Sequence, residues 1–168
     1  MPVKPLSQLA ESAIVLIDAN IFIYAARAAS PQCEEFLARC ARQEIRGLTT
    51  LEVLSEVCHQ LMLASARASG AVTQATASAL RHRRDAIRGL ANYWPVVAAV
   101  LDSNLAVLAL DQQRFRRAQI MRERYGLLTN DSLVLAAADS YGITNLATRD
   151  ADFDNVPWLT VYKPEDIA

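Results

Sequence analysis

Ala13-Ile14-Val15-Leu16-Ile17-Asp18-Ala19-Asn20 is the stretch that indicates the fold of this chain. Its run of apolar residues is typical of a strand that is buried within a sheet. Asp18 ends the strand, and the residues that follow predict a short helix over residues 20–29. A buried strand followed at once by a helix is the repeating unit of α/β proteins, whose strands pair in parallel through right-handed crossovers.

The alternation of strand and helix continues along the chain. Further strands are predicted at residues 45–49, 104–110, 143–147 and 159–162, and further helices at residues 31–43, 50–70, 72–91, 111–124 and 130–141. The 72–91 helix has Thr73 as its candidate N-cap and Leu80, Ile87 and Leu90 on its inner face, and Pro95 is expected to interrupt the next segment. We therefore expect an α/β fold with a central, mostly parallel β-sheet flanked by helices. It should form a single domain over residues 1–168, with a helical insertion around residues 70–95.

The composition is typical of a globular protein of the cytoplasm. The chain has 168 residues, of which 52% are hydrophobic and 21% are charged, so it can bury one sizeable core. No apolar run approaches the roughly 18 residues of a membrane helix, and the N-terminus lacks the apolar region of a signal peptide. We expect a cytoplasmic location and no membrane association.

Cysteine and histidine are poor candidates for metal ligands. The three cysteines, Cys33, Cys40 and Cys58, lack the spacing of a zinc or redox motif, so we expect them to be reduced. His59 and His82 are too few and too far apart for a zinc site. Any metal ion should therefore be a hard cation held by oxygen.

Arginine dominates the basic residues, although the net charge is -1. Fifteen of the seventeen basic residues are arginine, whose planar guanidinium suits phosphate. Two groups are evident, one over residues 81–88 and one over residues 114–124. Solvated helix faces account for such groups, and so do local basic patches that bind nucleic acid. The sequence leaves both explanations open.

Three aspartates lie where an open α/β sheet builds its sites. Asp18 and Asp150 each follow a predicted strand, and ligands bind outside the carboxyl ends of such strands. Asp131 falls within the apolar arc of its helix, so its carboxylate should face inward. For Asp18 a helix cap is the structural alternative. Thr129 or Asn130 can cap the later helix, which leaves Asp131 free for another role.

Two other acidic groups have more than one explanation. Asp150, Asp152 and Asp154 alternate, but the segment lacks the glycine and the glutamate that an EF-hand loop requires. A turn in which Asp152 or Asp154 caps a short helix fits better. Glu52 and Glu56 lie four residues apart on one face of a helix and outside its apolar arc, so periodicity does not choose between them.

Carboxylates that converge need a compensating charge. Two charges about 4 Å apart repel each other by roughly 4 kcal/mol at an effective dielectric of about 20. Raised carboxyl pKa values or a divalent cation can offset this repulsion. Oxygen ligands completed by a substrate phosphate favour Mg²⁺ or Mn²⁺. Phosphodiester hydrolysis is the chemistry that suits such a site.

Four segments together carry a resemblance to a known family. They are Val-Leu-Ile-Asp-Ala-Asn at residues 15–20, Leu-Thr-Thr-Leu-Glu-Val-Leu-Ser-Glu-Val at 48–57, Thr-Asn-Asp-Ser-Leu at 129–133 and Ala-Thr-Arg-Asp-Ala-Asp-Phe at 147–153. With these motifs in this order, nearly the whole chain resembles the PIN-domain ribonucleases, specifically the VapC-type toxins of toxin-antitoxin pairs.

The resemblance implies a set of site residues. The catalytic acids would be Asp18, Glu56, Asp131 and Asp150, and the metal ligands would be Asp18, Asp131 and Asp150. Glu56 is preferred over Glu52 because the family's glutamate usually lies some six residues beyond the second strand. Asn20 and Thr148 match polar positions that orient the acids or the substrate.

The resemblance also implies a function and partners. The chain would be a Mg²⁺-dependent (or Mn²⁺-dependent) endoribonuclease with RNA as its substrate. A small antitoxin would bind near the acidic cleft, and the protein would form a homodimer. Residues 70–95 are longer than in a minimal toxin of this kind.

Two other functions remain open from the sequence. A catalytically silent PIN-like module would serve protein interactions, although all four acid positions are filled here. A phosphatase of the haloacid dehalogenase type also places an aspartate after its first strand. That chemistry requires a second aspartate two residues later, where this chain has Asn20.

Overall fold

The computed structural model describes residues 3–167, whose strands form one parallel sheet. The strands are β1 (Val3–Pro5), β2 (Ile14–Ile17), β3 (Arg46–Thr50), β4 (Ala106–Leu108), β5 (Asn145–Ala147) and β6 (Thr160–Lys163). They lie in the order β1-β6-β5-β2-β3-β4, and each neighbouring pair is parallel. The predicted α/β fold is therefore confirmed, and within the described residues the sheet is parallel throughout.

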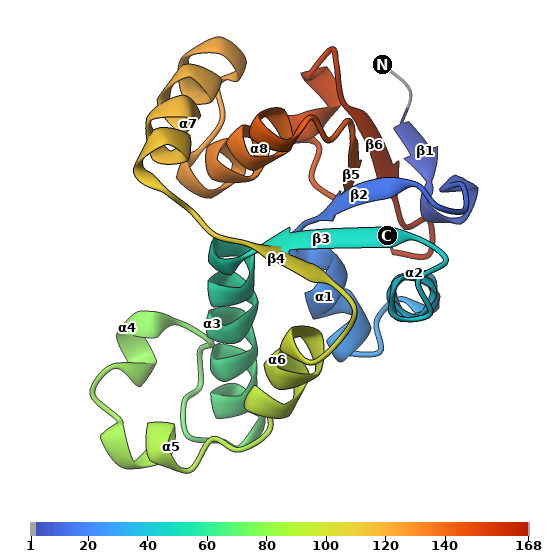
Figure 1. The fold of residues 1–168 in the computed structure, drawn as a ribbon. Coiled ribbons are helices and arrows are strands. Elements are labelled where there is room, and N and C mark those ends of the chain that lie inside the picture. Colours follow the sequence, from blue (N-terminus) through green and yellow to red (C-terminus); the bar gives the residue numbers. More distant parts are fainter. Residues whose placement is uncertain (1–2, 168) are drawn as a thin grey trace.

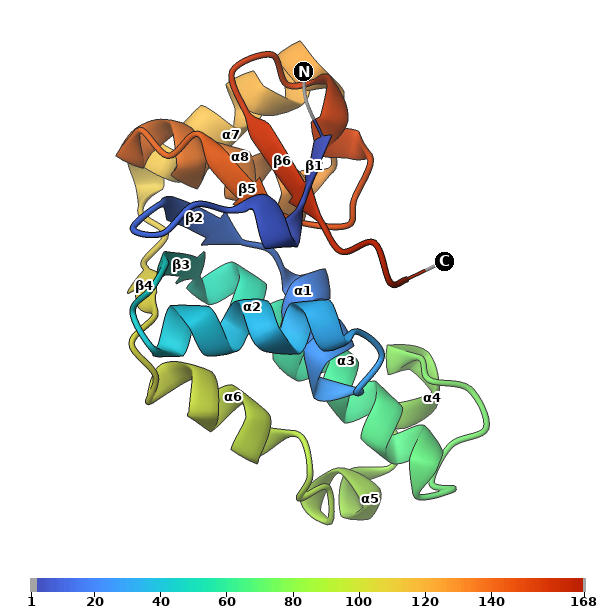
Figure 2. The same ribbon diagram turned by 90° about the vertical axis from the view of Figure 1, so that its right-hand side faces the viewer.

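Helices cover both faces of this sheet. They are α1 (Ala19–Ala26), α2 (Pro31–Ala41), α3 (Leu51–Ala68), α4 (Ala77–Leu80), α5 (Arg84–Arg88), α6 (Trp94–Leu101), α7 (Gln112–Tyr125) and α8 (Thr129–Tyr141), with 3-10 turns η1 (Leu6–Gln8) and η2 (Asp152–Asn155). Figures 1 and 2 show α7 and α8 on one face and α1, α2, α3 and α6 on the other. None of the helices within residues 3–167 is long and apolar enough to span a bilayer.

β2, the strand that precedes Asp18, lies in the middle of the sheet. β2 pairs with β3 on one side and with β5 on the other, and Leu16 is the register partner of both Leu48 and Leu146. Val15, Leu16 and Ile17 are fully buried, as a strand covered by helices on both faces requires. The carboxyl end of β2, and with it Asp18, is therefore held between two neighbouring strand ends.

The insertion was predicted as one helix over residues 72–91, and this prediction is wrong. The segment forms two short helices, α4 and α5, and Thr76 rather than Thr73 caps α4. Residues 73–78 are polar or small and are exposed, so no continuous apolar stripe exists to hold a long helix against the protein. Leu80 is buried and Ile87 and Leu90 are partly buried, as expected.

Two further boundaries differ from the prediction. Pro95 does not interrupt the chain but lies in the first turn of α6, where its missing N–H group would have no helical partner anyway. The strand predicted at 104–110 is shorter in the structure, where only β4 forms. The edge strand β1 was not predicted, because β1 is short and ends in a proline. Gly126 and Gly142 end α7 and α8 in the left-handed conformation, as their positions indicated.

Candidate active site

Asp18 is at once a helix cap and the centre of a polar network. It follows β2 directly and caps α1, and its Oδ1 accepts a hydrogen bond of 2.7 Å from the Ala19 amide. Its Oδ2 accepts bonds from Asn20 Nδ2 (2.7 Å) and from the Thr148 hydroxyl (2.6 Å). The capping explanation for Asp18 is therefore correct, and it does not exclude a second role.

Thr148 and Asn20 connect Asp18 to the loop that follows β5. The Thr148 hydroxyl donates to Asp18 and accepts from Asn20 Nδ2 (2.9 Å) and from the Asp150 amide (3.0 Å). Asn20 Oδ1 accepts from the Arg149 amide at 3.0 Å. All the hydrogen-bonding capacity of the hydroxyl is used. Both side chains therefore orient the acid-bearing segments in this structure.

Burial sets the protonation of Asp18. Its side chain is 9% exposed, and loss of solvation raises its pKa to about 6. The bonds from Thr148 and Ala19 lower the pKa, whereas the nearby charges of Glu56 and Asp150 raise it. Burial and negative neighbours outweigh three donated hydrogen bonds, which indicates a position that a cation would stabilise.

A second group of carboxylates lies beside this network. Oxygen atoms of Asp131, Asp150 and Asp152 all lie within 4.8 Å of one another. Asp150 Oδ1 accepts a hydrogen bond of 2.9 Å from the Asp152 amide. This bond closes a turn that brings the Asp152 carboxylate towards that of Asp150. The sequence predicted that Asp152 or Asp154 would cap a short helix, but the 3-10 turn η2 has no side-chain cap.

Asp131 faces this group from the first turn of α8. The N-cap of α8 is Leu128 and no side chain caps it, so the expected cap at Thr129 or Asn130 is wrong. Burial, followed by the charges of Asp150, Asp18, Asp152 and Glu56, raises the pKa of Asp131 to about 6. Four other carboxylates thus act on Asp131, and we call these five acids, Asp18, Glu56, Asp131, Asp150 and Asp152, the acidic site.

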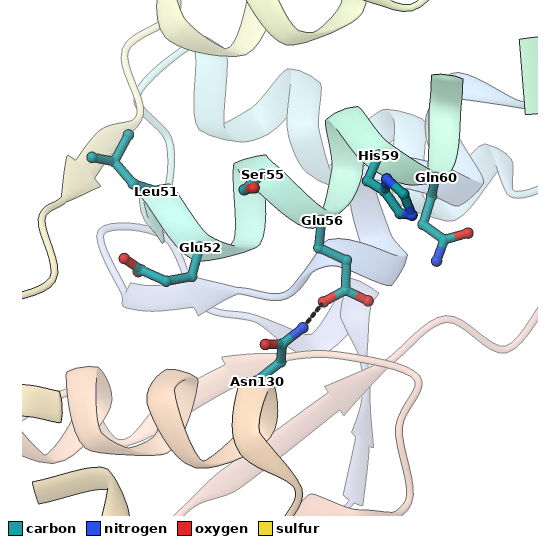
Figure 3. Close-up of a pocket in the computed structure, with 7 residues that line it drawn as sticks. All are labelled: Leu51, Glu52, Ser55, Glu56, His59, Gln60 and Asn130. Atoms are coloured by element: carbon teal, nitrogen blue, oxygen red, sulfur yellow. Dashed lines mark hydrogen bonds between the residues drawn. The ribbon is translucent and has the colours of Figure 1, made fainter. Parts of the chain in front are cut away.

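Glu56 reaches the acidic site from α3. Asn130 Nδ2 donates to Glu56 Oε2 at 3.0 Å and links α3 to the start of α8 (Figure 3). The charge of Glu56 acts on both Asp18 and Asp131, whereas Glu52 is not among the groups that shift either pKa. Both glutamates line a groove of about 540 Å³ along α3, together with Leu51, Ser55, His59, Gln60 and Asn130.

The donor set of the acidic site fits a hard divalent cation. Its ligand atoms are carboxylate oxygens from α8 and from the segment after β5, which Mg²⁺ and Mn²⁺ prefer. Burial is the main cause of both raised pKa values, and the neighbouring carboxylates raise them further. Asp154 takes no part in the cluster, because it accepts a bond from Lys163 Nζ at 2.8 Å.

Other candidate residues lie outside the acidic site. Cys33 and Cys40 are buried and reduced, and burial raises the pKa of the Cys33 thiol to about 11, so neither is a reactive thiolate. His59 is an exposed residue of the α3 groove and His82 is an exposed residue of the insertion.

The chain is similar to several known proteins. Ribonuclease VapC6 of Methanocaldococcus jannaschii is 38% identical over 64 residues, a match that spans 38% of this chain and only 37% of that protein. VapBC2 of Rickettsia felis, solved with a DNA fragment from its promoter, has a TM-score of 0.58 and 16% identity over 90% of this chain and 99% of that one. Mycobacterium tuberculosis VapC20, a toxin that cleaves the sarcin-ricin loop, has a TM-score of 0.58 and 16% identity over 88% and 98%.

At these identities the solved structures show likeness of fold. The family model for the PIN domain matches residues 15–159, which include β2 with Asp18, the α3 glutamates, the start of α8 and the segment after β5. The match covers well over half of the chain and every member of the acidic site. The chain therefore belongs to the PIN domain family.

Proposed function

We propose that this chain is a metal-dependent endoribonuclease that hydrolyses phosphodiester bonds of RNA. The observation that carries the proposal is the cluster of Asp131, Asp150 and Asp152, whose carboxylate oxygens lie within 4.8 Å of one another. Thr148 joins Asp18 to this cluster through its bonds to Asp18 and to the Asp150 amide. Membership of the PIN domain family and the likeness to a protein named as a ribonuclease support the same chemistry. They also leave the haloacid dehalogenase alternative without support.

Within this proposal, the aspartates of the acidic site bind the metal ion and Glu56 acts on the attacking water. Asp131 and Asp150, with Asp18 and the newly found Asp152 beside them, would hold Mg²⁺ or Mn²⁺. The cation, when bound, supplies Lewis acidity that lowers the pKa of a water molecule and stabilises charge on the phosphate. Glu56, oriented by Asn130, accepts a proton from the water that attacks phosphorus, and the bond to the 3′ oxygen breaks.

Asn20 and Thr148 act as positioning residues in this proposal. They bind Asp18 and the amides of residues 149 and 150, so they fix two acids relative to each other. Their polar atoms are already occupied within the protein. An orienting role towards the acids is therefore better supported than direct contact with RNA.

A toxin of a VapBC-type toxin-antitoxin pair is the biological role that we propose, with a small antitoxin as partner and a homodimer as the assembly, in the cytoplasm. The fold likeness to VapBC2 and to VapC20 supports this role. Co-expression with any short reading frame found next to the gene, followed by size-exclusion chromatography, tests it. A lack of complex formation would remove the antitoxin from the proposal and leave the nuclease chemistry untouched.

The nuclease proposal is tested by cleavage of an RNA panel with and without Mg²⁺. Wild-type protein should cleave at least one RNA only when Mg²⁺ or Mn²⁺ is present, and Asp18→Asn should lose at least a hundredfold in rate. Asp154→Asn is a matched control, because this aspartate binds Lys163 outside the cluster. Equal activity of Asp18→Asn and wild type would refute the assignment.

A further inference from the structure

The charge of this protein is divided unevenly between the insertion and the rest. Residues 70–95 contain four arginines and one aspartate, a net charge of +3, so the remaining residues carry -4 against the total of -1. The acidic site and the α3 groove, which contains no lysine or arginine, account for much of the negative part. Residues 70–95 are thus one of two basic segments of the chain, the other being residues 114–124. A basic segment of this kind indicates an anionic partner.

Most of the positive charge on the insertion is not neutralised by the protein. Arg88 pairs with Asp85 at 2.9 Å. Within residues 3–167, no carboxylate forms an ion pair with Arg81, Arg83 or Arg84, and all three side chains are exposed. Arg81 Nε donates to His82 Nε2 at 2.9 Å, a contact with a neutral acceptor that leaves the guanidinium charge in place. We call Arg81, Arg83 and Arg84 the arginine cluster.

The arginine cluster stands on a small core of its own. Leu80, which directly precedes Arg81, is buried against Leu63, Ala66 and Val72, and Ile87 packs on the same group. Thr76 caps the start of α4 through the Ala79 amide. Because the residues on both sides of the cluster are anchored, its position relative to α3 is defined by packing and not by a free loop.

α3 links the arginine cluster to the acidic site. The helix starts at the carboxyl end of β3, carries Glu56 in its second turn and contacts both α4 and α5 further on. Figure 1 shows α3 running away from the sheet, with α4 on the same side of the molecule as the carboxyl ends of the strands. Leu80, which directly precedes the cluster, packs on Leu63 and Ala66. These two residues lie about 10–15 Å beyond Glu56 along the helix axis, so the cluster is separated from the acidic site by more than one helical turn.

We infer that the arginine cluster binds the phosphate backbone of RNA at a distance from the bond that is cut. This inference rests on the proposed nuclease function. A group of five carboxylates repels a polyanion, so affinity for RNA has to come from cations elsewhere on the surface. Exposed guanidinium groups without carboxylate partners supply that attraction, and their planar shape suits phosphate oxygens.

The experiment compares the triple variant R81Q/R83Q/R84Q with wild type on two substrates. For cleavage, the ratio of kcat/KM for a long hairpin RNA to kcat/KM for a dinucleotide should fall about tenfold, because only the long RNA reaches the cluster. For binding, titrations of the hairpin in the Asp18→Asn background should show that the slope of log Kd against log salt is smaller by about 2, at roughly 0.7 for each lost phosphate contact.

Two control variants accompany the triple substitution. R81K/R83K/R84K keeps the charges and should retain most of the salt slope. Arg46→Gln removes an exposed arginine at the opposite, amino end of β3 and should leave the substrate ratio unchanged. Thermal unfolding of each variant separates a binding loss from a folding loss.

Several outcomes overturn the inference. The first is an unchanged substrate ratio and an unchanged salt slope in the triple variant. The second is an equal fall of the substrate ratio in Arg46→Gln. The third is a change in oligomeric state of the triple variant without a change in RNA affinity, which would assign the cluster to a contact between copies of the chain. If wild type binds the hairpin with the stated slopes but cleaves no RNA, the proposed function fails and the inference stands. If wild type cleaves RNA and the triple variant matches it in both assays, the inference about the arginine cluster fails and the proposed function stands.

Discussion

Thr148 is the residue on which the geometry of the acidic site most depends. Its hydroxyl is completely buried and takes part in three hydrogen bonds, to Asp18, Asn20 and the Asp150 amide. Thr148 directly follows β5, which pairs in parallel with β2 and with β6. Its backbone is therefore held in place by the sheet. One hydroxyl thus connects Asp18 to the segment that carries Asp150.

Thr148→Val should destabilise the protein by about 1–3 kcal/mol, because the shape is kept but buried polar partners lose their bonds. Urea unfolding gives this difference. Thr49→Val is the matched control: Thr49 is equally buried but its side chain makes one hydrogen bond among the described residues, to the Ile17 carbonyl at 3.1 Å. A loss of about 1 kcal/mol is therefore expected there. A smaller effect at Thr148 than at Thr49 would contradict the network.

Asp131 and Asp18 should make the metal-free protein less stable as the pH rises. Each has a pKa of about 6 in the folded protein against 3.8 when unperturbed. The folded state holds these protons more tightly than the unfolded state. The stabilisation is therefore complete below pH 3.8 and is lost as the pH passes through about 6.

Asp131→Asn removes one of these two groups. In EDTA at pH 7.5 it should be about 1 kcal/mol more stable than wild type, a value reduced for solvent screening at a partly exposed side chain. The gain should shrink at pH 5, where wild-type Asp131 is mostly protonated. Urea midpoints at the two pH values measure it, and a gain that does not depend on pH would point to packing instead.

Asp152 shows what the sequence could not provide at this scale. The sequence predicted Asp150 as a site acid and assigned Asp152 and Asp154 alike to a turn that caps a short helix. What separates them is the bond from the Asp152 amide to Asp150 and the ion pair of Asp154 with Lys163. Both depend on how η2 folds back on the sheet, a tertiary property that residue spacing does not contain.

At the scale of elements, α3 decides between the two glutamates. Glu52 and Glu56 share a helical face, and sequence periodicity could not rank them. Asn130 at the start of α8 makes the difference, since it binds Glu56 one turn further along the helix. The choice therefore required knowledge of where α8 begins relative to α3.

Glu56→Gln should lower kcat roughly a hundredfold, as expected for a residue that accepts a proton. Glu52→Gln is the matched control, on the same helix and in the same groove, and should change kcat by less than about threefold. Cleavage of one RNA by the three proteins under the same Mg²⁺ concentration provides the comparison. A larger loss for Glu52→Gln would exchange the roles of the two residues.

The ends of α7 and α8 were predictable, whereas the insertion was not. Glycines at 126 and 142 signalled the helix ends because both need a positive φ, which is observed at 70° and 65°. In the insertion, helix propensity favoured one long helix, but burial of Leu80 against α3 and the lack of an apolar stripe divide it into α4 and α5. Tertiary contact overrode local preference in that segment.

Gly142→Ala should destabilise the protein by about 1 kcal/mol, since a Cβ atom is strained at its φ of 65°. Gly89→Ala is the comparison: its φ is -84°, and an added Cβ would lie 3.6 Å from its nearest neighbours. That variant should be as stable as wild type or slightly more so. Thermal denaturation distinguishes the two, and equal effects would show that φ is not the cause.

At the scale of the whole molecule, the acidic site and the fold should stabilise each other through the cation. A ligand that binds only the folded protein at a hundred times its Kd adds about 2.7 kcal/mol of stability. For a chain of this size, that corresponds to a rise in Tm of roughly 5–10 °C. Differential scanning fluorimetry with saturating Mg²⁺ measures the rise, which Asp131→Asn should largely remove; Na⁺ at matched ionic strength is the control.

The strand order determines when the acidic site can form during synthesis of the protein. β2 pairs with β5, so Asp18 meets Asp150 only after the intervening residues have been made. At the usual speed of translation this takes on the order of ten seconds. During that time the ribosome holds a chain that has its first acid but no assembled site. If the proposed activity is correct, the nascent polypeptide cannot damage RNA around the ribosome until β5 has emerged and joined the sheet.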